Sequence, residues 1–314
     1  MLLFKSRHET PKELKMKYSN KTGLPDAIVR AIQNDDYTKG KSDISITGLT
    51  SPARKRVLLK KFDDQIEVDY ADKINILMGQ IAHGILERAN KAALAEERFY
   101  LEIEGITISG EMDAVYEDTG LLQDYKLTSL YQIKDGKVSP DYEAQLNCYA
   151  YLLKHGHRLV DGKRVPANYK ITKLQDVFIL KDWSKPKALR DPQNVPPYQC
   201  VIIDVDLWPE EKTREYIVSR IKAHKAANKK LPECTEEERW AEPTKYAVMG
   251  KKGAAKSLKN HDNKEDAEQH AARVGGFVEE RPGTSNRCMA YCEAASVCEQ
   301  WKKISSPRKQ ITEE

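Results

Sequence analysis

The sequence lacks several features that would assign it at once to a broad class of proteins. No apolar run approaches the roughly 20 residues that a helix spanning a bilayer requires. The apolar stretch Met1–Phe4 is followed immediately by Lys5, Arg7 and His8, which leaves no signal-peptide core. There is no internal repeat, no long low-complexity tract and no Gly-x-x-x-x-Gly-Lys-Ser/Thr loop, so any ATP-driven step would come from another protein. We therefore expect a cytoplasmic globular protein with no membrane segment.

Neither sign of charge dominates the sequence. The 314 residues include 52 basic and 48 acidic side chains, a net charge of +4, which by itself favours a polyanionic partner only slightly. The apolar share of 40% suffices for one sizeable core with an appendage, or for two modest domains. Basic residues do gather locally, where they either contact phosphates or form solvated faces of helices and loops: Arg54–Arg56, Lys60–Lys61, Lys229–Lys230 and Lys251–Lys252.

Hydrophobic periodicity and turn residues divide the chain into three predicted segments. Residues 1–44 are polar and lack a sustained period, so we interpret them as a partly ordered N-terminal arm. Residues 45–230 predict an α/β fold, with a mixed central β-sheet flanked by helices. Residues 231–314 predict a cysteine-containing subdomain with a small inserted hairpin and helix unit. The expected elements are helices 52–62, 72–95, 141–155, 209–228 and 264–274, strands 99–105, 106–117, 121–127, 176–180 and 199–205, and a short hairpin at 245–249.

Two adjoining strands bring acidic and basic side chains close together. Turn residues after the run 106–117 predict a β-hairpin with the strand that follows. Asp124 and Lys126 are two residues apart and leave the same face of the second strand, and Asp113 can approach them from the first. Two carboxylates beside a lysine suit the metal-assisted cleavage of a phosphodiester bond, because hard oxygen ligands bind Mg²⁺ or Mn²⁺. The alternative for an isolated Asp-x-Lys pair is a surface ion pair.

Further polar residues lie on the predicted helices that precede and follow these strands. His83 lies on helix 72–95, where a lone histidine more often has a structural hydrogen bond than a metal to bind. Gln145 and Tyr149 are one turn apart on helix 141–155, for which we expect Asp141 to be the cap. Their alternative is a polar residue and a core aromatic residue on an ordinary amphipathic helix.

In this order, His83, Gly110-Glu-Met-Asp113, Asp124-Tyr-Lys126 and Gln145-x-x-x-Tyr149 resemble the signature of the PD-(D/E)XK nucleases, and more narrowly of their RecB-type branch. The resemblance covers roughly residues 45–301 and implies a restriction-endonuclease-like core. It implies that Asp113, Asp124, the backbone carbonyl of Tyr125 and His83 bind Mg²⁺ or Mn²⁺. Lys126 would orient the attacking water or stabilise developing negative charge, and Gln145 and Tyr149 would contact the DNA strand or the catalytic residues.

Six cysteines in a cytoplasmic chain do not imply disulfides, and their spacing separates them into two kinds. Cys148 lies in a helix and Cys200 in an apolar strand, so we interpret both as small buried hydrophobic residues. Near the C-terminus three thiols fall within eleven residues, which favours binding of a soft metal, and Cys234 is the best-placed fourth ligand. These three are Cys288, Cys292 and Cys298.

Late cysteine clusters of this kind also resemble those of RecB-type nucleases in which one early and three late cysteines hold an iron–sulfur cluster. In the best-known members the early cysteine precedes the catalytic motifs, whereas Cys234 follows them, so the fourth ligand stays open. We place a structural [4Fe–4S] cluster ahead of Zn²⁺, with free reduced thiols as the alternative. The region 231–301 resembles bacteriophage-encoded exonucleases of the superfamily.

These observations predict a Mg²⁺- or Mn²⁺-dependent deoxyribonuclease, and specifically an exonuclease. A DNA-binding protein without catalysis would have no need of Asp113, Asp124 and Lys126 together. Two further hypotheses stay open: an enzyme that acts on a different phosphate ester, and a nuclease subunit that requires a helicase or recombination partner. The biological role, whether phage recombination, host DNA degradation or repair, would use the same residues in each case.

Overall fold

The computed structural model describes all but a few segments of the chain. Described are residues 16–34, 40–90, 94–95 and 97–306. No helix among them is long and apolar enough to cross a membrane. Residues 1–15 and 35–39 of the predicted N-terminal arm lie outside the described residues. The described part of the arm contains β1 (Lys17–Ser19) and α1 (Asp26–Gln33), and β1 pairs in parallel with β3 (Glu67–Asp69).

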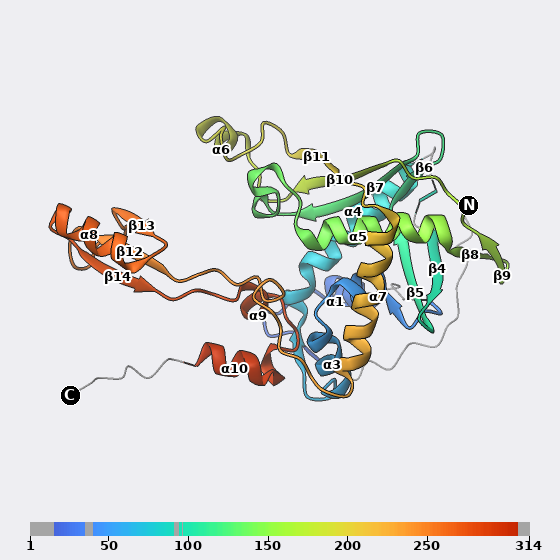
Figure 1. Cartoon of the computed structure of the whole chain (residues 1–314), viewed down its shortest axis with the longest axis horizontal. Coiled ribbons are helices and arrows are strands. Elements are labelled where there is room, and N and C mark those ends of the chain that lie inside the picture. Colours follow the sequence, from blue (N-terminus) through green and yellow to red (C-terminus); the bar gives the residue numbers. More distant parts are fainter. Residues whose placement is uncertain (1–15, 35–39, 91–93, 96, 307–314) are drawn as a thin grey trace. The chain divides into compact units, whose positions relative to one another are not determined.

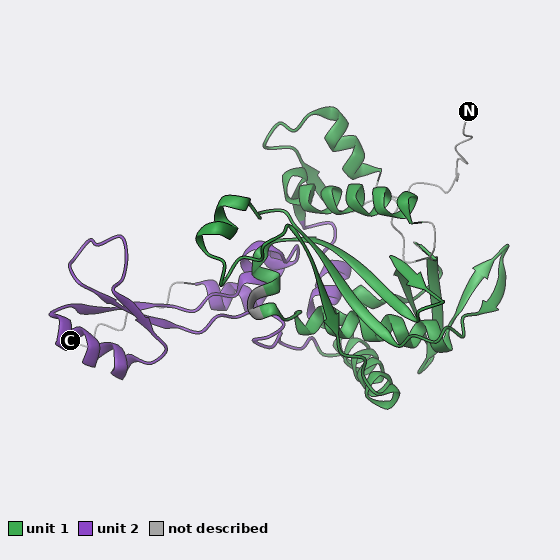
Figure 2. Ribbon diagram, turned by 90° about the horizontal axis from the view of Figure 1, so that it is seen from above, with its two compact units in different colours: residues 1–53, 67–230 green, residues 54–66, 231–314 purple. Residues whose placement is uncertain are grey.

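The chain forms two compact units, drawn in green and purple in Figure 2. Unit 1 contains residues 1–53 and 67–230, and unit 2 contains residues 54–66 and 231–314. The sequence pattern predicts residues 54–66 as part of the core segment. In the structure they group with the C-terminal residues, because Leu58 packs against Ala294 and Cys298.

Unit 1 contains a four-stranded and a five-stranded sheet, whose strands follow the orders β11-β10-β7-β6 and β2-β5-β4-β8-β9. In the first sheet β7 and β10 are parallel and the other pairs are antiparallel. The predicted mixed α/β core is therefore confirmed. The strand bounds are β2 Ile44–Ser45, β4 Glu97–Ile103, β5 Ile106–Met112, β6 Ala114–Tyr116, β7 Leu121–Thr128, β8 His157–Val160, β9 Lys163–Pro166, β10 Lys173–Leu180 and β11 Cys200–Val205.

The predicted hairpin differs from the observed one at Asp113. A single strand over 106–117 is wrong, because β5 ends at Met112 and pairs with β4, whereas β6 pairs with β7 in the other sheet. At the break the Asp113 carboxylate accepts a hydrogen bond from the Tyr125 backbone N–H at 2.6 Å. This contact replaces a backbone ladder bond with a side-chain bond, so the chain changes sheets and still satisfies a donor of β7.

Helices cover the sheets of unit 1, and α5 makes the main contribution to its core. It lies along β4, β5, β7 and β10, and is green in Figure 1. Leu146, Leu152 and Leu153 are fully buried in the main hydrophobic cluster, at about 1.5–3 kcal/mol for each buried side chain. The helices and 3-10 helices are α2 Ile46–Thr50, η1 Tyr70–Lys73, α4 Ile74–Ala89, η2 Leu130–Gly136, α5 Pro140–His155, α6 Lys185–Arg190 and α7 Glu210–Ala227.

Three local expectations about unit 1 are wrong. Helix α5 is capped by Ser139, whose hydroxyl accepts from the Tyr142 N–H, because Pro140 already occupies the first helical position. Helix α4 ends at Ala89 rather than near residue 95 and has no fully buried side chain among the described residues. Cys200 is exposed, because β11 is an edge strand of its sheet.

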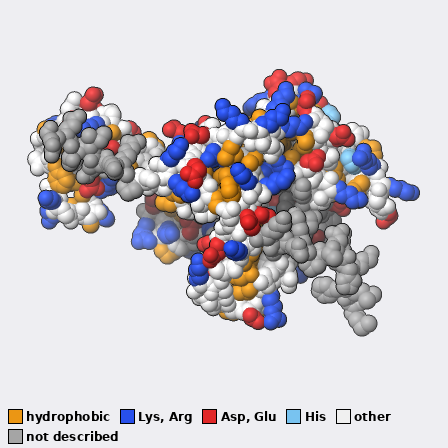
Figure 3. Space-filling model, turned by 90° about the horizontal axis from the view of Figure 1, so that it is seen from below, with side chains coloured by type: hydrophobic (Ala, Val, Ile, Leu, Met, Phe, Trp, Pro, Cys, Tyr) orange, Lys and Arg blue, Asp and Glu red, His pale blue; other side chains and the backbone are white. Residues whose placement is uncertain are grey.

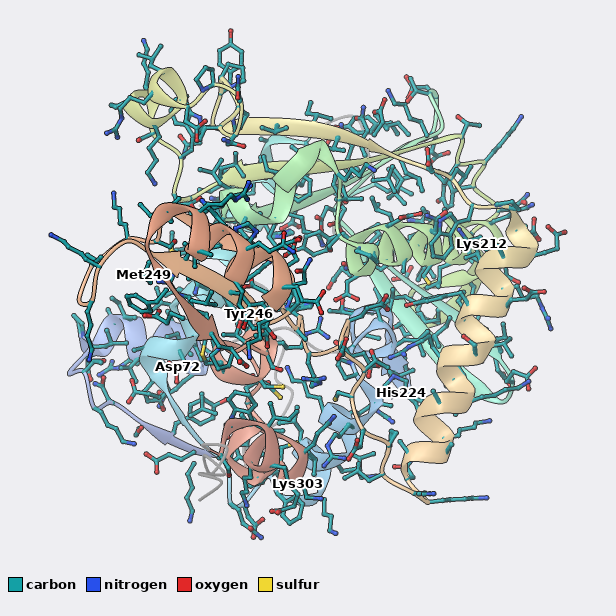
Figure 4. All side chains as sticks on the ribbon, turned by 60° about the vertical axis from the view of Figure 1, so that its left-hand side comes forward. Asp72, Lys212, His224, Tyr246, Met249 and Lys303 are labelled. Carbon is teal, nitrogen blue, oxygen red and sulfur yellow. The ribbon has the colours of Figure 1, made fainter. Side chains whose placement is uncertain are left out.

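Helix α7 fixes the position of α2. Buried His224 and its neighbour Arg220 both donate hydrogen bonds to the Leu49 carbonyl, at 3.1 and 3.0 Å, and Arg220 also donates to the Ser51 carbonyl at 2.7 Å. These bonds satisfy carbonyls at the C-terminal end of α2, which an isolated helix would leave without partners. Figure 4 labels His224 and, nearer the other end of α7, Lys212.

Unit 2 is built from short elements. Helix α3 (Ala53–Lys61) packs with η3 (Ala295–Val297) and α10 (Glu299–Ser305) in a small cluster around Leu58, Ala294 and Cys298. The predicted inserted unit is a three-stranded sheet of order β13-β12-β14 with one helix; Figure 4 labels Tyr246 and Met249 on its central strand. The remaining bounds in unit 2 are β12 Lys245–Met249, β13 Lys259–His261, α8 Lys264–Val274, β14 Phe277–Arg281 and α9 Asn286–Ala290.

Candidate active site

Strand β7 places two of the predicted residues on one face. Asp124 is 3% exposed, and the Lys126 ammonium forms an ion pair with its Oδ2 atom. The ammonium is therefore the charged partner of Asp124 Oδ2. The alternative of a surface ion pair does not apply, because both side chains are largely buried.

The side chain of Asp113 contacts both β7 and helix α4. Its Oδ2 atom accepts the Tyr125 N–H, and its Oδ1 atom lies 3.3 Å from Nδ1 of His83. The Asp113 side chain is 8% exposed, whereas the His83 side chain is 33% exposed. Tyr125 therefore contributes through its backbone N–H, and His83 reaches the carboxylates from a helix at the surface of unit 1.

Helix α5 presents Gln145 and Tyr149 to the same residues. Gln145 Oε1 accepts from the Lys126 ammonium at 3.0 Å, and Gln145 Nε2 donates to the Tyr149 hydroxyl at 2.7 Å. Glycine at position 110 is required here, because a Cβ atom would lie 2.6 Å from the Tyr149 ring. The structure thus brings together His83, Asp113, Asp124, Lys126, Gln145 and Tyr149 within unit 1.

Burial and neighbouring charges set the protonation of the central pair. Burial raises the pKa of Asp124 to about 6, with Lys126 opposing this shift and Asp113 adding to it. Burial alone would lower the pKa of Lys126, but Asp124, Tyr149 and Asp113 together hold that pKa above its usual value. Lys126 is therefore an ammonium at neutral pH in this arrangement.

Two residues beside the pair are not among those that the sequence motifs indicate. The Tyr142 ring lies 4.9 Å from the Lys126 ammonium, as in a cation–π contact. Asp176 on β10 lies in register with Asp124 and is fully buried. Burial, with Asp124 and then Asp113 adding to it against Lys126, raises the pKa of Asp176 to about 7. The available sequence signal was a single carboxylate within the apolar run Leu174–Leu180.

The four predicted cysteine ligands lie near one another in unit 2. Burial is the first cause that raises the pKa of Cys234, to about 12, and Glu238, Cys288 and Cys298 add to that shift. Burial likewise raises the pKa values of Cys288 and Cys292, and Cys298 adds to both. Cys298 Sγ accepts from Arg54 Nε at 3.2 Å. Gln300 holds the Cys234 backbone through two hydrogen bonds of 2.8 and 2.9 Å. The thiols are neighbours on loops and short helices.

Neither region has the tight geometry of ligands around a bound ion. Among the described residues, no three His, Cys, Asp or Glu side chains converge as the ligands of a metal do. The donor chemistry nevertheless fits. Near β7, both carboxylate oxygens of Asp176 are buried without a hydrogen-bond partner in the described part of the chain, and buried Asp124 Oδ2 is paired with the Lys126 ammonium. Such oxygen atoms are the ligands that Mg²⁺ and Mn²⁺ prefer, and four neighbouring thiols suit iron or zinc.

Comparison with known proteins identifies the family. A model of the PD-(D/E)XK nuclease superfamily matches residues 56–299, which is more than half of the chain. The chain belongs to the PD-(D/E)XK nuclease superfamily. The match covers every motif residue of the superfamily signature described above, from His83 to Tyr149. No curated protein matches the chain.

Two solved structures resemble parts of this superfamily member. The crystal structure of SSO0001 has a TM-score of 0.40 and 17% sequence identity, over 62% of this chain and 83% of that one. The crystal structure of a phage-related exonuclease from Haemophilus somnus 129PT has a TM-score of 0.30 and 20% identity, over 57% of this chain and 80% of that one.

Proposed function

We propose that the chain is a Mg²⁺- or Mn²⁺-dependent deoxyribonuclease of the RecB-type branch, acting as an exonuclease. One observation carries the proposal: Asp113, Asp124 and Lys126 lie together in a buried site of a superfamily member, with Lys126 held by Gln145. A protein that only binds DNA would gain nothing from burying this arrangement, since buried charges cost free energy unless they are paired. The choice of exonuclease rests on the four-part motif resemblance.

The divalent ion would be held by Asp113, Asp124, the Tyr125 backbone carbonyl and His83. When bound, such an ion supplies a nucleophilic water of lowered pKa and neutralises charge on the phosphate. The fit is supported by the buried carboxylates of Asp113 and Asp124. The His83 side chain is the most exposed of the three side-chain ligands, so substrate and solvent can reach this end of the site.

Lys126 acts as a positively charged group in this proposal. Asp124, Tyr149 and Asp113 favour its ammonium form, and a divalent ion beside the carboxylates would weaken the influence of the two carboxylates. An ammonium that donates to Gln145 can stabilise negative charge that develops on the phosphate. It can equally orient the attacking water, so both roles implied by the resemblance are proposed for Lys126.

DNA is the proposed substrate, and local basic residues rather than overall charge would contact its phosphates. On the face drawn in Figure 3, lysine and arginine side chains lie among aspartate and glutamate side chains. Neutralisation by such scattered groups gives non-specific, salt-dependent binding. This agrees with an enzyme that reads the backbone of DNA and not its sequence.

We also propose that Cys234, Cys288, Cys292 and Cys298 bind a structural metal centre, with [4Fe–4S] ahead of Zn²⁺. The support is that the four thiols are partly or fully buried and close enough to affect one another's pKa values. Iron and acid-labile sulfide measured in protein purified without air would favour the cluster. Stoichiometric zinc would reverse the order, and folded, active protein with neither would refute a metal centre.

The decisive test is cleavage of end-labelled linear and covalently closed circular DNA, single- and double-stranded, with Mg²⁺, Mn²⁺ or chelator. Asp124→Asn and Lys126→Met should each lower metal-dependent cleavage of linear DNA by on the order of 1,000-fold. Asp204→Asn and Lys173→Met are matched controls, because both residues are solvent-exposed on the same sheet. Cleaved circles would make the enzyme an endonuclease. Wild-type protein that binds DNA without cutting it would indicate a silent binder or a subunit lacking its helicase or recombination partner.

A further inference from the structure

Asp176 is a buried carboxylate that the superfamily motifs do not explain. It lies on β10 at the position in register with Asp124 of β7, and because aligned residues of parallel strands share a face, the two side chains leave the same side of the sheet. On its other side, Asp176 is in register with Ile203 of β11. Asp176 is 0% exposed, and neither of its carboxylate oxygens has a hydrogen-bond partner among the described residues.

Burying an ionised carboxylate costs free energy unless a hydrogen-bond donor or a cation compensates its charge. Buried polar groups are nearly always hydrogen-bonded, and an isolated buried carboxylate either becomes neutral or finds a cation. The groups that act on Asp176 are Asp124, Lys126 and Asp113. The Lys126 ammonium is already engaged with Asp124 and Gln145, so it offsets only part of the negative charge of Asp176.

The local charges leave room for a divalent cation. Three ionised carboxylates and one ammonium sum to two negative charges, which a single divalent ion would balance. Asp113 already uses one oxygen for the Tyr125 N–H and directs the other toward His83. Asp124 Oδ2 is paired with the Lys126 ammonium, whereas neither oxygen of Asp176 has a hydrogen-bond partner in the described part of the chain, so the carboxylate that lacks a partner lies on β10 beside Asp124 of β7.

We propose that Asp124 and Asp176 together bind a divalent cation, so that Asp176 is an additional metal ligand of the catalytic site. Two carboxylates are sufficient, because Mg²⁺ commonly binds one or two carboxylates and completes its octahedron with water and substrate phosphate. The assignment rests on the proposed function for its catalytic meaning, but the binding of the ion can be tested without any cleavage assay.

The test is titration of full-length protein with Mn²⁺, with free Mn²⁺ measured by electron paramagnetic resonance. Asp176→Asn should bind one ion fewer, or bind Mn²⁺ on the order of tenfold more weakly than wild type. Asp204→Asn is the matched control, because Asp204 is an exposed aspartate on the adjacent strand β11, and it should bind as wild type does. Mn²⁺ should also raise the melting temperature of wild type more than that of Asp176→Asn.

Asparagine has the size of aspartate and resembles its neutral acid form, so folding of the variant is expected. If Asp176→Asn binds Mn²⁺ with wild-type stoichiometry and affinity, Asp176 is a neutral acid in the native protein and the proposal is wrong. It is equally wrong if wild type binds no Mn²⁺. If wild type fails to cleave DNA yet loses Mn²⁺ binding on Asp176→Asn, the metal assignment stands and the nuclease proposal falls.

Discussion

The proposed catalytic site and the cysteine region place their reactive groups by different means. Asp124 and Lys126 lie on β7, which is in register with β10 along its whole length. In the cysteine region Cys288 lies on the five-residue helix α9, Cys298 precedes α10, and Cys234 lies on a loop. Backbone hydrogen bonds of a sheet therefore hold the first set, whereas a few side-chain bonds hold the second.

This difference leads to opposite expectations for the two regions. A sheet retains its register whether or not an ion is bound, so the carboxylates should keep their arrangement in chelator. The thiols are held by Arg54 and Gln300, and two or three hydrogen bonds contribute only about 1 kcal/mol each. We therefore expect removal of metal to disorder the cysteine region, and to abolish activity in the catalytic site without unfolding its sheet.

The largest expected effect is on the cysteine region. Structural zinc in small peptides has apparent binding free energies of about 10–16 kcal/mol, so loss of a comparable centre should remove cooperative folding of its surroundings. Cys298→Ser should lower metal content and produce a separate, low-temperature unfolding transition by calorimetry. Cys200→Ser should change neither, because Cys200 is exposed. A single unchanged transition in Cys298→Ser would show that both regions are held by protein contacts alone.

Sequence patterns predicted the helices and strands of both regions better than they predicted which of these elements pack against one another. The predicted helix 264–274 matches α8 residue for residue, because Asn263 is its N-cap and Gly275 adopts the left-handed conformation that ends it. The Gln145 and Tyr149 spacing could be predicted for the same reason, since residues one turn apart share a helix face. Local patterns are sufficient for features that depend on neighbours in sequence.

Features set by distant contacts could not be predicted. Asp176 lies beside Asp124 only through the parallel register of β7 and β10, and no local pattern specifies which strands will pair. The chain changes sheets at Asp113 because of the hydrogen bond to Tyr125, which the alternating pattern of 106–117 does not reveal. Residues 54–66 belong to unit 2 through contacts of Leu58 with residues more than 200 positions later.

The second largest effect is on the pH dependence of stability. It tests whether burial of Asp176 in the sheet lowers the free energy of unfolding when its carboxylate is ionised. Because the pKa of Asp176 is about 7 in the folded protein, against an ordinary value of 3.8, the native state favours the neutral acid. Its stabilising contribution is complete below pH 3.8 and is lost as pH rises through 7, a difference of about 4 kcal/mol. In chelator, Asp176→Asn should therefore exceed wild type in urea stability by an amount that grows from pH 4 to pH 8. A gain that is constant with pH would contradict this.

A smaller effect is expected at Gly110, where packing rather than charge holds the site. Alanine there would place Cβ 2.6 Å from Tyr149 Cε1, and overpacking of this kind costs about 1–3 kcal/mol. Displacing Tyr149 should also move Gln145 away from Lys126, so cleavage should fall together with stability. Gly84→Ala is the matched control, because an added Cβ atom there would meet no described atom within 4 Å beyond its adjacent residues and the nearby backbone of its own helix, and alanine favours a helix. Equal stabilities for the two variants would mean that the sheet around position 110 accommodates the added methyl group without strain.

The smallest effect is expected from the Tyr149 hydroxyl, and it separates positioning from stability. Tyr149→Phe removes the group that accepts from Gln145 Nε2 and should cost about 1–2 kcal/mol of unfolding free energy. If that bond orients Gln145 toward Lys126, the rate of bound-substrate cleavage should fall while the KM for DNA stays constant. Tyr151→Phe, on the same helix but only partly buried, should leave the rate unchanged. A rise in KM alone would instead place the Tyr149 hydroxyl in contact with DNA, the second role that the motif allows.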